Sequence, residues 1–237
     1  MQIALPVLRR CLNGFTPETA LHVGAHQAEE AEMYEALGVR EVHWVEAQPE
    51  LCSQLQRKLN PATNFIYNAA VWSKGGVKKE FLITNNSLSS SLFTLKSHLE
   101  VHPEVEEISR LQITTSRLDE ILPRKKFDLI NVDVQGAEAE LQALQGLGDL
   151  LRETQLIYLE VNKAELYEGI DLVPAVDCFL AGEGFRRVVT LWVPRKGWGE
   201  AIYMRDVTAP TVFAARFINL YYFTKDILRK LRKRVFS

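Results

Sequence analysis

Residues 21–26 read Leu-His-Val-Gly-Ala-His, and residues 44–46 read Trp-Val-Glu. The first segment predicts a buried strand that ends at a glycine turn, and the second predicts a neighbouring strand that ends in a carboxylate. A strand, a tight turn, a helix and a second strand with an acidic end are typical of α/β sheets that bind a nucleoside. The two segments therefore predict a nucleoside site near the start of the chain.

The turn and the carboxylate have separate chemical uses. Gly24 lacks a Cβ, so the turn can approach a ligand, and the following helix start offers N–H groups to a carboxylate or phosphate. Glu46 is placed to accept hydrogen bonds from ribose hydroxyls. A purely structural turn would also explain Gly24, but Glu46 at the expected interval favours the functional interpretation.

Strand and helix patterns alternate through the rest of the chain. Hydrophobic patterning predicts strands at 19–23, 42–45, 64–71, 77–84, 111–115, 127–132, 155–159, 185–193 and 200–204. It predicts helices at 29–37, 49–59, 118–122, 139–147 and 172–180. This alternation indicates an α/β fold with a mostly parallel sheet, helices on both faces and right-handed crossovers.

The chain length and composition favour one domain with short appendages. At 237 residues and 47% hydrophobic, the chain can bury one sizeable core. We expect an N-terminal helical segment at 1–18, the α/β domain at 19–206 and a basic amphipathic helix at 207–237. Three widely spaced cysteines are typical of small core residues in a reducing compartment, so we expect a cytoplasmic protein.

Polar residues follow the predicted strands at the point where each strand ends. They are His22 to His26, Glu46, Asn68, Asp133 and Glu160 to Asn162. Ligands of open α/β sheets bind at the carboxyl ends of the strands, so these residues are expected to form one site.

The turn after the first strand distinguishes between cofactors. A nicotinamide dinucleotide would need a fuller Gly-x-Gly-x-x-Gly pattern, whereas Gly24 is followed by His26 and Ala28. The carboxylates of Glu29, Glu30 and Glu32 would repel a diphosphate. They suit S-adenosylmethionine better, because that cofactor carries a sulfonium and an ammonium.

Taken in order, the motifs resemble those of the FkbM-type S-adenosylmethionine-dependent methyltransferases. The resemblance covers about residues 19 to 206 and is carried by residues 24–26, 46–49, 68–70, 91–92, 115–119, 133–138 and 160–162. It implies the Rossmann-like class I methyltransferase fold, with seven strands of which the last is antiparallel. It also implies methyl transfer to an oxygen of a sugar, a glycan or a secondary metabolite.

The resemblance also implies how the cofactor is held. Gly24 and Ala25 would line its methionine end, Glu46 would bind the ribose, and Asn68 with Ala69 would border the adenine, while Ala47 also belongs to the expected cofactor site. His22, His26 and Asp133 complete the expected cofactor site, although a turn histidine also serves as a local hydrogen-bonding group. The chain departs from the family pattern at His22, where Asp is common, and at Ala28, where Gly is usual.

Methyl transfer to a hydroxyl needs a positioned acceptor and a group that takes its proton. Asp133 is the first candidate for that base, and Glu160 and His26 are the others. Ser89 and Ser90, in the polar run 85–91, are candidates for substrate contact with Gln135 and Asn162. His98 and His102 have a spacing that suits a metal, but Pro103 favours an exposed loop, so we assign no metal ligands and a divalent metal is not indicated.

Charge is unevenly distributed along the chain. The net charge of −2 gives no general attraction to nucleic acid. Residues 216–237 contain seven basic residues and one acidic residue, a net charge of +6, which leaves −8 for residues 1–215. The basic helix predicted there has three alternative partners: the chain's own body, a second subunit in a homo-oligomer, or an anionic membrane surface.

Two other functions remain open from the sequence. One is a nicotinamide-dependent oxidoreductase on a similar sheet, and the other is a non-catalytic, methyltransferase-like binding protein. The preferred interpretation is an O-methyltransferase that acts on a small-molecule or glycan hydroxyl.

Overall fold

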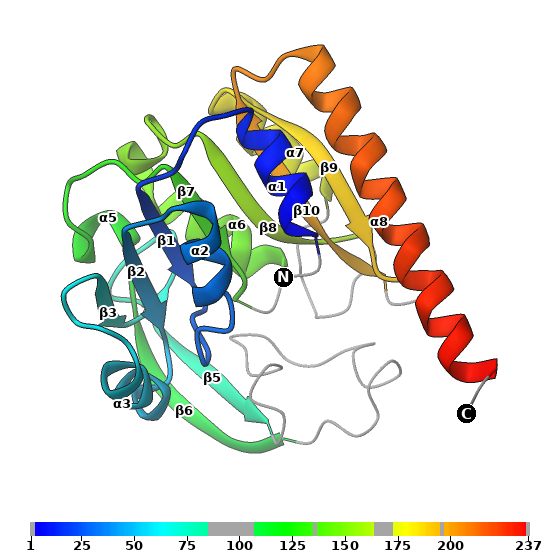
Figure 1. The fold of residues 1–237 in the computed structure, drawn as a ribbon. Helices are drawn as coiled ribbons and strands as arrows, with labels where there is room; N and C mark the ends of the chain where they lie inside the picture. The colour runs from blue at the N-terminus through cyan, green and yellow to red at the C-terminus, as the bar shows by residue number, and fades with distance from the viewer. Residues whose placement is uncertain (1–2, 85–106, 135–136, 164–172, 195–196, 236–237) are drawn as a thin grey trace.

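Seven strands form the central sheet of the computed structural model, in the order β3-β2-β1-β7-β8-β10-β9 (Figure 1). The structure describes residues 3–84, 107–134, 137–163, 173–194 and 197–235. The strands are β1 (Thr19–Val23), β2 (Glu41–Glu46), β3 (Asn64–Asn68), β7 (Leu129–Val132), β8 (Leu156–Asn162), β9 (Phe185–Trp192) and β10 (Trp198–Arg205). All neighbours pair in parallel except β10, which runs antiparallel to β8 and β9. The predicted mostly parallel sheet with an antiparallel last strand is confirmed.

Helices cover both faces of this sheet. One face carries α1 (Leu5–Leu12), α2 (Ala31–Leu37), α3 (Pro49–Lys58) and α8 (Ala209–Val235), and the other carries α5 (Leu118–Ile121), α6 (Ala137–Gly146), the 3-10 helix Gly148–Leu151 and α7 (Val173–Gly182). Strand residues alternate between the two cores. In β1, for example, Leu21 and Val23 pack towards α6 while Ala20 packs towards α1. Strands buried on both faces explain the nearly continuous apolar runs in the sequence.

A smaller sheet flanks the first and corrects one prediction. It contains β4 (Ala70–Val71), β6 (Glu107–Ser116) and β5 (Lys78–Thr84) in that order. The single strand predicted at 64–71 is wrong, because the chain leaves the main sheet after Asn68. The Ala69 N–H donates to the Glu46 carbonyl, and Ala70 then pairs with Thr115. Arg117 precedes α5 and makes no side-chain cap.

The predicted C-terminal helix is present as α8, which packs against α1 and β9. Its Ala215 is fully buried in the core that also contains Val7 and Leu8 of α1. Within the described ranges, every helix is too short or too polar to cross a membrane. Cys11 and Cys52 are buried as expected, whereas Cys178 is exposed.

Candidate active site

The carboxyl ends of the parallel strands bring the predicted polar residues to one edge of the sheet. The register aligns Val23 with Val45 on one side and with Val132 on the other, and Val132 with Leu159. Gly24, Glu46, Asp133 and Glu160 therefore lie at the ends of neighbouring strands. The parallel topology assembles them from segments that are far apart in the sequence.

The turn at Gly24 is tightly constrained by the fold itself. Gly24 has a φ of +89°, and a Cβ at this position would lie 1.7 Å from the carbonyl oxygen of Asp133. The N–H groups of Gly24 and Ala25 both donate to the Val45 carbonyl. The glycine is thus required by the passage of β7 beside the turn, which is a reason that the sequence did not reveal.

Glu46 is the buried carboxylate of this edge. It is 6% exposed, its Oε2 accepts the His26 N–H at 2.9 Å, and its Oε1 accepts the Gln48 N–H at 2.9 Å. Burial raises the pKa of the Glu46 carboxyl, and the two backbone N–H groups act in the opposite direction by stabilising the charged form. A carboxylate has about four acceptor positions, more than these backbone N–H groups fill, so Glu46 could also accept a ligand hydroxyl.

Asn68 braces the end of β3 against the end of β2. Its Nδ2 donates to the carbonyls of Glu46 and Ala47, each at 3.0 Å, while the Ala69 N–H donates to the Glu46 carbonyl. The side chain of Asn68 is otherwise exposed. The segment that was expected to border the adenine is therefore fixed directly to the residue expected to hold the ribose.

The imidazole of His22 lies in a buried aromatic cluster beneath the turn. It is 2% exposed, its Nδ1 is 2.9 Å from the Tyr34 hydroxyl, and it stacks on Trp44 with ring centroids 5.1 Å apart. Burial lowers the pKa of His22 to about 4, so the ring is neutral at physiological pH. Asn131 donates to the Tyr34 hydroxyl at 3.2 Å and completes the cluster.

His26 and Ala28 both have left-handed backbone conformations, with φ of +43° and +56°. The His26 Nδ1 lies 2.6 Å from the Glu29 carboxylate, which gives this turn histidine a local partner. Ala28 is 2% exposed and occupies the position where the family usually has glycine. The turn therefore keeps the glycine-like backbone although a methyl group is present.

Glu160 and Asn162 extend from β8 next to Asp133. Glu160 is half-buried, and desolvation together with the negative charge of Asp133 raises its pKa to about 8. Asn162 is fully buried, and its Nδ2 lies 3.5 Å from the Glu160 carboxylate. Its Oδ1 has no hydrogen-bond partner in the described part of the chain. A carboxyl whose pKa lies near 7 can exchange a proton with a substrate at physiological pH.

Glu140, in α6, is a site residue that the sequence analysis missed. It is fully buried, its Oε1 accepts the Val134 N–H at 3.1 Å, and its Oε2 is unpartnered within the described residues. Burial, with the charges of Glu160 and Asp133, raises its pKa well above the usual range. A carboxylate near the start of a helix that follows a turn was the available signal, because such residues often bind the turn's free N–H groups.

Several predicted residues lie outside the described residues. They are Ser89, Ser90 and Gln135, and also His98 and His102. Across the ranges that the structure describes, no group of three or more His, Cys, Asp or Glu side chains could hold a metal ion.

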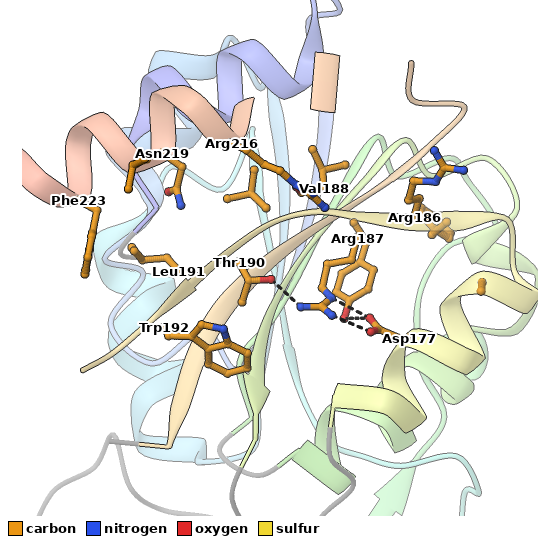
Figure 2. A pocket seen from close by; sticks show the side chains of 15 residues that line it. Asp177, Arg186, Arg187, Val188, Thr190, Leu191, Trp192, Arg216, Asn219 and Phe223 are labelled. Carbon is orange, nitrogen blue, oxygen red and sulfur yellow. Dashed lines mark hydrogen bonds and ion pairs between the residues drawn. The ribbon is translucent and has the colours of Figure 1, made fainter. Parts of the chain in front are cut away.

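A separate cavity of about 860 Å³ lies at the other edge of the sheet, between β9 and α8 (Figure 2). Two of its arginines bind other residues of the chain. Arg187 forms a bidentate ion pair with Asp177, and Arg216 donates to the Val188 carbonyl at 2.7 Å. Trp192 lines the cavity at the carboxyl end of β9, where the Lys163 ammonium lies 4.9 Å from its ring centroid. Glu46 and Asp133 do not line this cavity.

The strand order, the antiparallel β10, the glycine turn after β1 and the acidic end of β2 together define a Rossmann-like methyltransferase fold. A model of the methyltransferase FkbM domain matches residues 22–187. The chain belongs to the FkbM methyltransferase family, and this membership implies S-adenosylmethionine as the methyl donor. It decides against the nicotinamide oxidoreductase that the sequence had left open.

Individual proteins resemble the chain more distantly. The 2-O-methyltransferase NoeI of Sinorhizobium fredii is 26% identical over 176 residues, which cover 66% of this chain and 71% of NoeI. Sp1610 of Streptococcus pneumoniae has a TM-score of 0.50 at 12% identity, covering 99% of this chain and 87% of that one. A protein of the NADB-Rossmann superfamily from Streptococcus agalactiae also has a TM-score of 0.50 at 12% identity, covering 100% and 86%. At these identities the two solved structures establish the fold alone.

Proposed function

We propose that the protein transfers a methyl group from S-adenosylmethionine to a hydroxyl oxygen of a sugar, a glycan or a secondary metabolite. The observation that carries the proposal is Glu160, a carboxyl with a pKa raised to about 8, beside Asp133 and Asn162 at the carboxyl end of β8. The likeness to NoeI, a 2-O-methyltransferase, supports oxygen as the acceptor atom.

The residues present fit a cationic nucleoside. Glu46 can accept a ribose hydroxyl, because its carboxylate has about four acceptor positions and its backbone N–H partners do not fill them all. Burial, with the negative charges of neighbouring carboxylates, raises the pKa values of Glu140 and Glu160. A positive charge bound beside them would favour their ionised forms. S-adenosylmethionine would supply an electrophilic methyl group on a positively charged sulfur, which leaves as a neutral thioether.

Each residue of the cofactor site has a proposed part. Gly24, Ala25 and His26 bind the methionine end through the turn, and Asn68, Ala47 and Ala69 hold the adenine side. His22 supports the turn indirectly, because its neutral ring hydrogen-bonds to Tyr34 and stacks on Trp44 beneath the turn. A neutral imidazole cannot replace the carboxylate that the family usually has here, so the ammonium group is expected to rely on other carboxylates.

Glu160 is the proposed base. As the new carbon–oxygen bond forms, the hydroxyl proton of the acceptor passes to the Glu160 carboxylate. Asp133 orients the acceptor and favours proton uptake by Glu160, since its charge raises the Glu160 pKa. Asn162 holds Glu160 through its amide and offers its unpartnered Oδ1 to the acceptor. Ser89, Ser90 and Gln135 remain proposed acceptor contacts.

Two measurements test this function. Isothermal titration with S-adenosylmethionine and its demethylated product should show binding of both ligands. Release of the demethylated product should then be followed with a panel of sugars, glycosides and hydroxylated aromatic compounds. Glu160→Gln should keep cofactor affinity and lower kcat by roughly 10²–10⁴-fold, the usual contribution of a general base.

The matched control is Glu153→Gln, because Glu153 is exposed and precedes the opposite end of β8. This variant should behave like the wild type. Absence of binding for both ligands would contradict the cofactor assignment. Turnover that is unchanged in Glu160→Gln would contradict the assignment of the base.

A further inference from the structure

An apolar stripe runs along the outer face of α8. Phe213, Phe217, Leu220 and Tyr221 follow the three- and four-residue spacing of one helix face and are 75%, 66%, 59% and 55% exposed. The inner face of the same helix packs on the body through Val212, Ala215, Ile218 and Tyr222. The helix is therefore apolar on two sides, and only one side is covered by the described chain. Large apolar groups gathered on a surface indicate a contact site.

The helix is held firmly where the stripe lies. Arg216 binds the Val188 carbonyl on the edge strand β9, and Asn219 and Phe223 line the groove beside Leu191 and Trp192 (Figure 2). The stripe is thus presented by a helix that is fixed to the sheet. The stripe is therefore exposed in the folded domain, with α8 bound to β9.

Beyond the stripe the helix becomes strongly basic. Residues 216–237 carry a net charge of +6, while residues 1–215 carry −8. Figure 1 shows that the last turns of α8 project past the body, on the side of the sheet to which β1, β2 and β9 point their carboxyl ends. The basic end of α8 and the carboxyl ends of these strands therefore lie towards one side of the molecule, and the stripe lies further back along the same helix.

We propose that the outer face of α8 docks on an anionic lipid surface. Phe213, Phe217, Leu220 and Tyr221 enter the boundary between headgroups and acyl chains, and the basic end binds the lipid phosphates. An anionic lipid surface would contact both the apolar stripe and the basic end of α8. A second copy of the chain is the alternative occupant, and its residues 1–215, with a net charge of −8, would have to meet the basic end while the two stripes pair. A lipid surface presents apolar and anionic groups together along the whole helix.

Docking through α8 would hold the domain at the membrane surface. Acceptors carried on lipids, such as glycolipids or lipid-linked sugars, would then be concentrated near the protein. The docking surface goes beyond the proposed methyl transfer, because none of its residues belongs to the cofactor site.

Co-sedimentation with vesicles tests the proposal with the full chain. The protein should pellet with phosphatidylcholine vesicles that contain phosphatidylglycerol, and little should pellet with phosphatidylcholine alone. Added salt should reduce the pelleted fraction, because it screens the charge interaction. The double variant Phe213→Gln, Phe217→Gln should weaken vesicle binding by roughly tenfold or more, since two large apolar side chains no longer leave water.

The matched control is Ile108→Gln, which removes a side chain that is 65% exposed on β6, away from α8. It should pellet like the wild type. The α8 double variant should keep its thermal stability and its affinity for S-adenosylmethionine, which separates failure of docking from failure of the site.

Three results would overturn the proposal. One is equal pelleting of the wild type and the α8 variant, and another is pelleting that does not depend on lipid charge. The third is a wild-type dimer, measured by light scattering, that becomes a monomer in the double variant while neither protein pellets. That last result would identify a second copy of the chain as the occupant.

Discussion

The carbonyl oxygen of Asp133 occupies the space that a Cβ on residue 24 would need, because such a Cβ would lie 1.7 Å from it. One glycine therefore joins the turn after β1 to the end of β7, the two places from which the site is built. The contact spans more than a hundred residues of sequence. It links the stability of the fold to the geometry of the site.

Gly24→Ala is predicted to lower the free energy of unfolding by roughly 2–5 kcal/mol, from backbone strain and overpacking together. Gly14→Ala is the control, since Gly14 has a φ of +90° and nothing within 4 Å of a Cβ. That variant should lose only the strain of about 1–2 kcal/mol. Chemical denaturation of both measures the difference, and equal losses would show that the turn relaxes away from Asp133.

Ala28→Gly is predicted to leave stability unchanged or to raise it by up to about 1 kcal/mol. Relief of the left-handed conformation is worth about 1–2 kcal/mol, and loss of the buried methyl costs about 0.8 kcal/mol. Ala36→Gly, an exposed site in α2, should instead lose about 0.5–1 kcal/mol. Thermal unfolding of the two variants should therefore differ in sign. A clear destabilisation by Ala28→Gly would mean that the methyl group is needed for packing.

Glu46→Gln is predicted to weaken binding of S-adenosylhomocysteine by roughly 10–100-fold, the loss of a charged acceptor worth about 1.5–3 kcal/mol. Burial raises the pKa of Glu46, so wild-type affinity should also fall as the pH is lowered and the carboxyl is protonated. The variant should lack this pH dependence. Glu50→Gln, at an exposed position in the first turn of α3, should titrate like the wild type.

Glu160 gives a pH signature of its own. Its pKa is about 8 in the folded protein against an ordinary value of 4.5, so the folded state binds more protons between these values. The contribution of this group to stability is therefore fully present below pH 4.5 and is lost as pH rises towards 8. Urea denaturation across this range should show a shallower fall for Glu160→Gln than for the wild type. Identical slopes would show that Glu160 titrates normally.

The same shift predicts that cofactor binding releases a proton. A positive charge beside Glu160 lowers its pKa, so binding near pH 7 should expel part of the bound proton. Titrations of S-adenosylmethionine in buffers with different ionisation enthalpies count these protons. The count should fall in Glu160→Gln and stay constant in Glu153→Gln.

Local signals were sufficient to predict the main sheet and the basic C-terminal helix. The short apolar runs gave the strands, and Gly38, which ends α2 with a φ of +92°, marks a helix end where it was predicted. The break after Asn68 was not predictable in this way, because the Asn68 side chain and the Ala69 N–H bind Glu46 and Ala47, which belong to another strand. Propensity along one segment carries no information about such a partner.

The candidate site was also predictable from the sequence only in part. The sequence placed Glu46, Asp133 and Glu160 at strand ends from patterning alone. It could not show that His22 points into a cluster with Tyr34, or that Glu140 is buried, because both depend on which face of an element meets the core. Charged residues within an amphipathic helix usually face water, so the position of Glu140 near a helix start was its one signal of a bond to the turn's N–H groups.

The packing of α1 against α8 bears on how the protein is made. The Ile3 N–H binds the Glu200 carboxylate across 197 residues of sequence, and the face of α1 around Leu8 is closed by a helix that ends at Val235. During synthesis α1 is therefore made long before α8, and its apolar face stays exposed to solvent in that interval. The domain can complete this core only once α8 has been synthesised as far as Tyr222. A product that terminates before the helix reaches these residues keeps an open apolar face and is prone to aggregate.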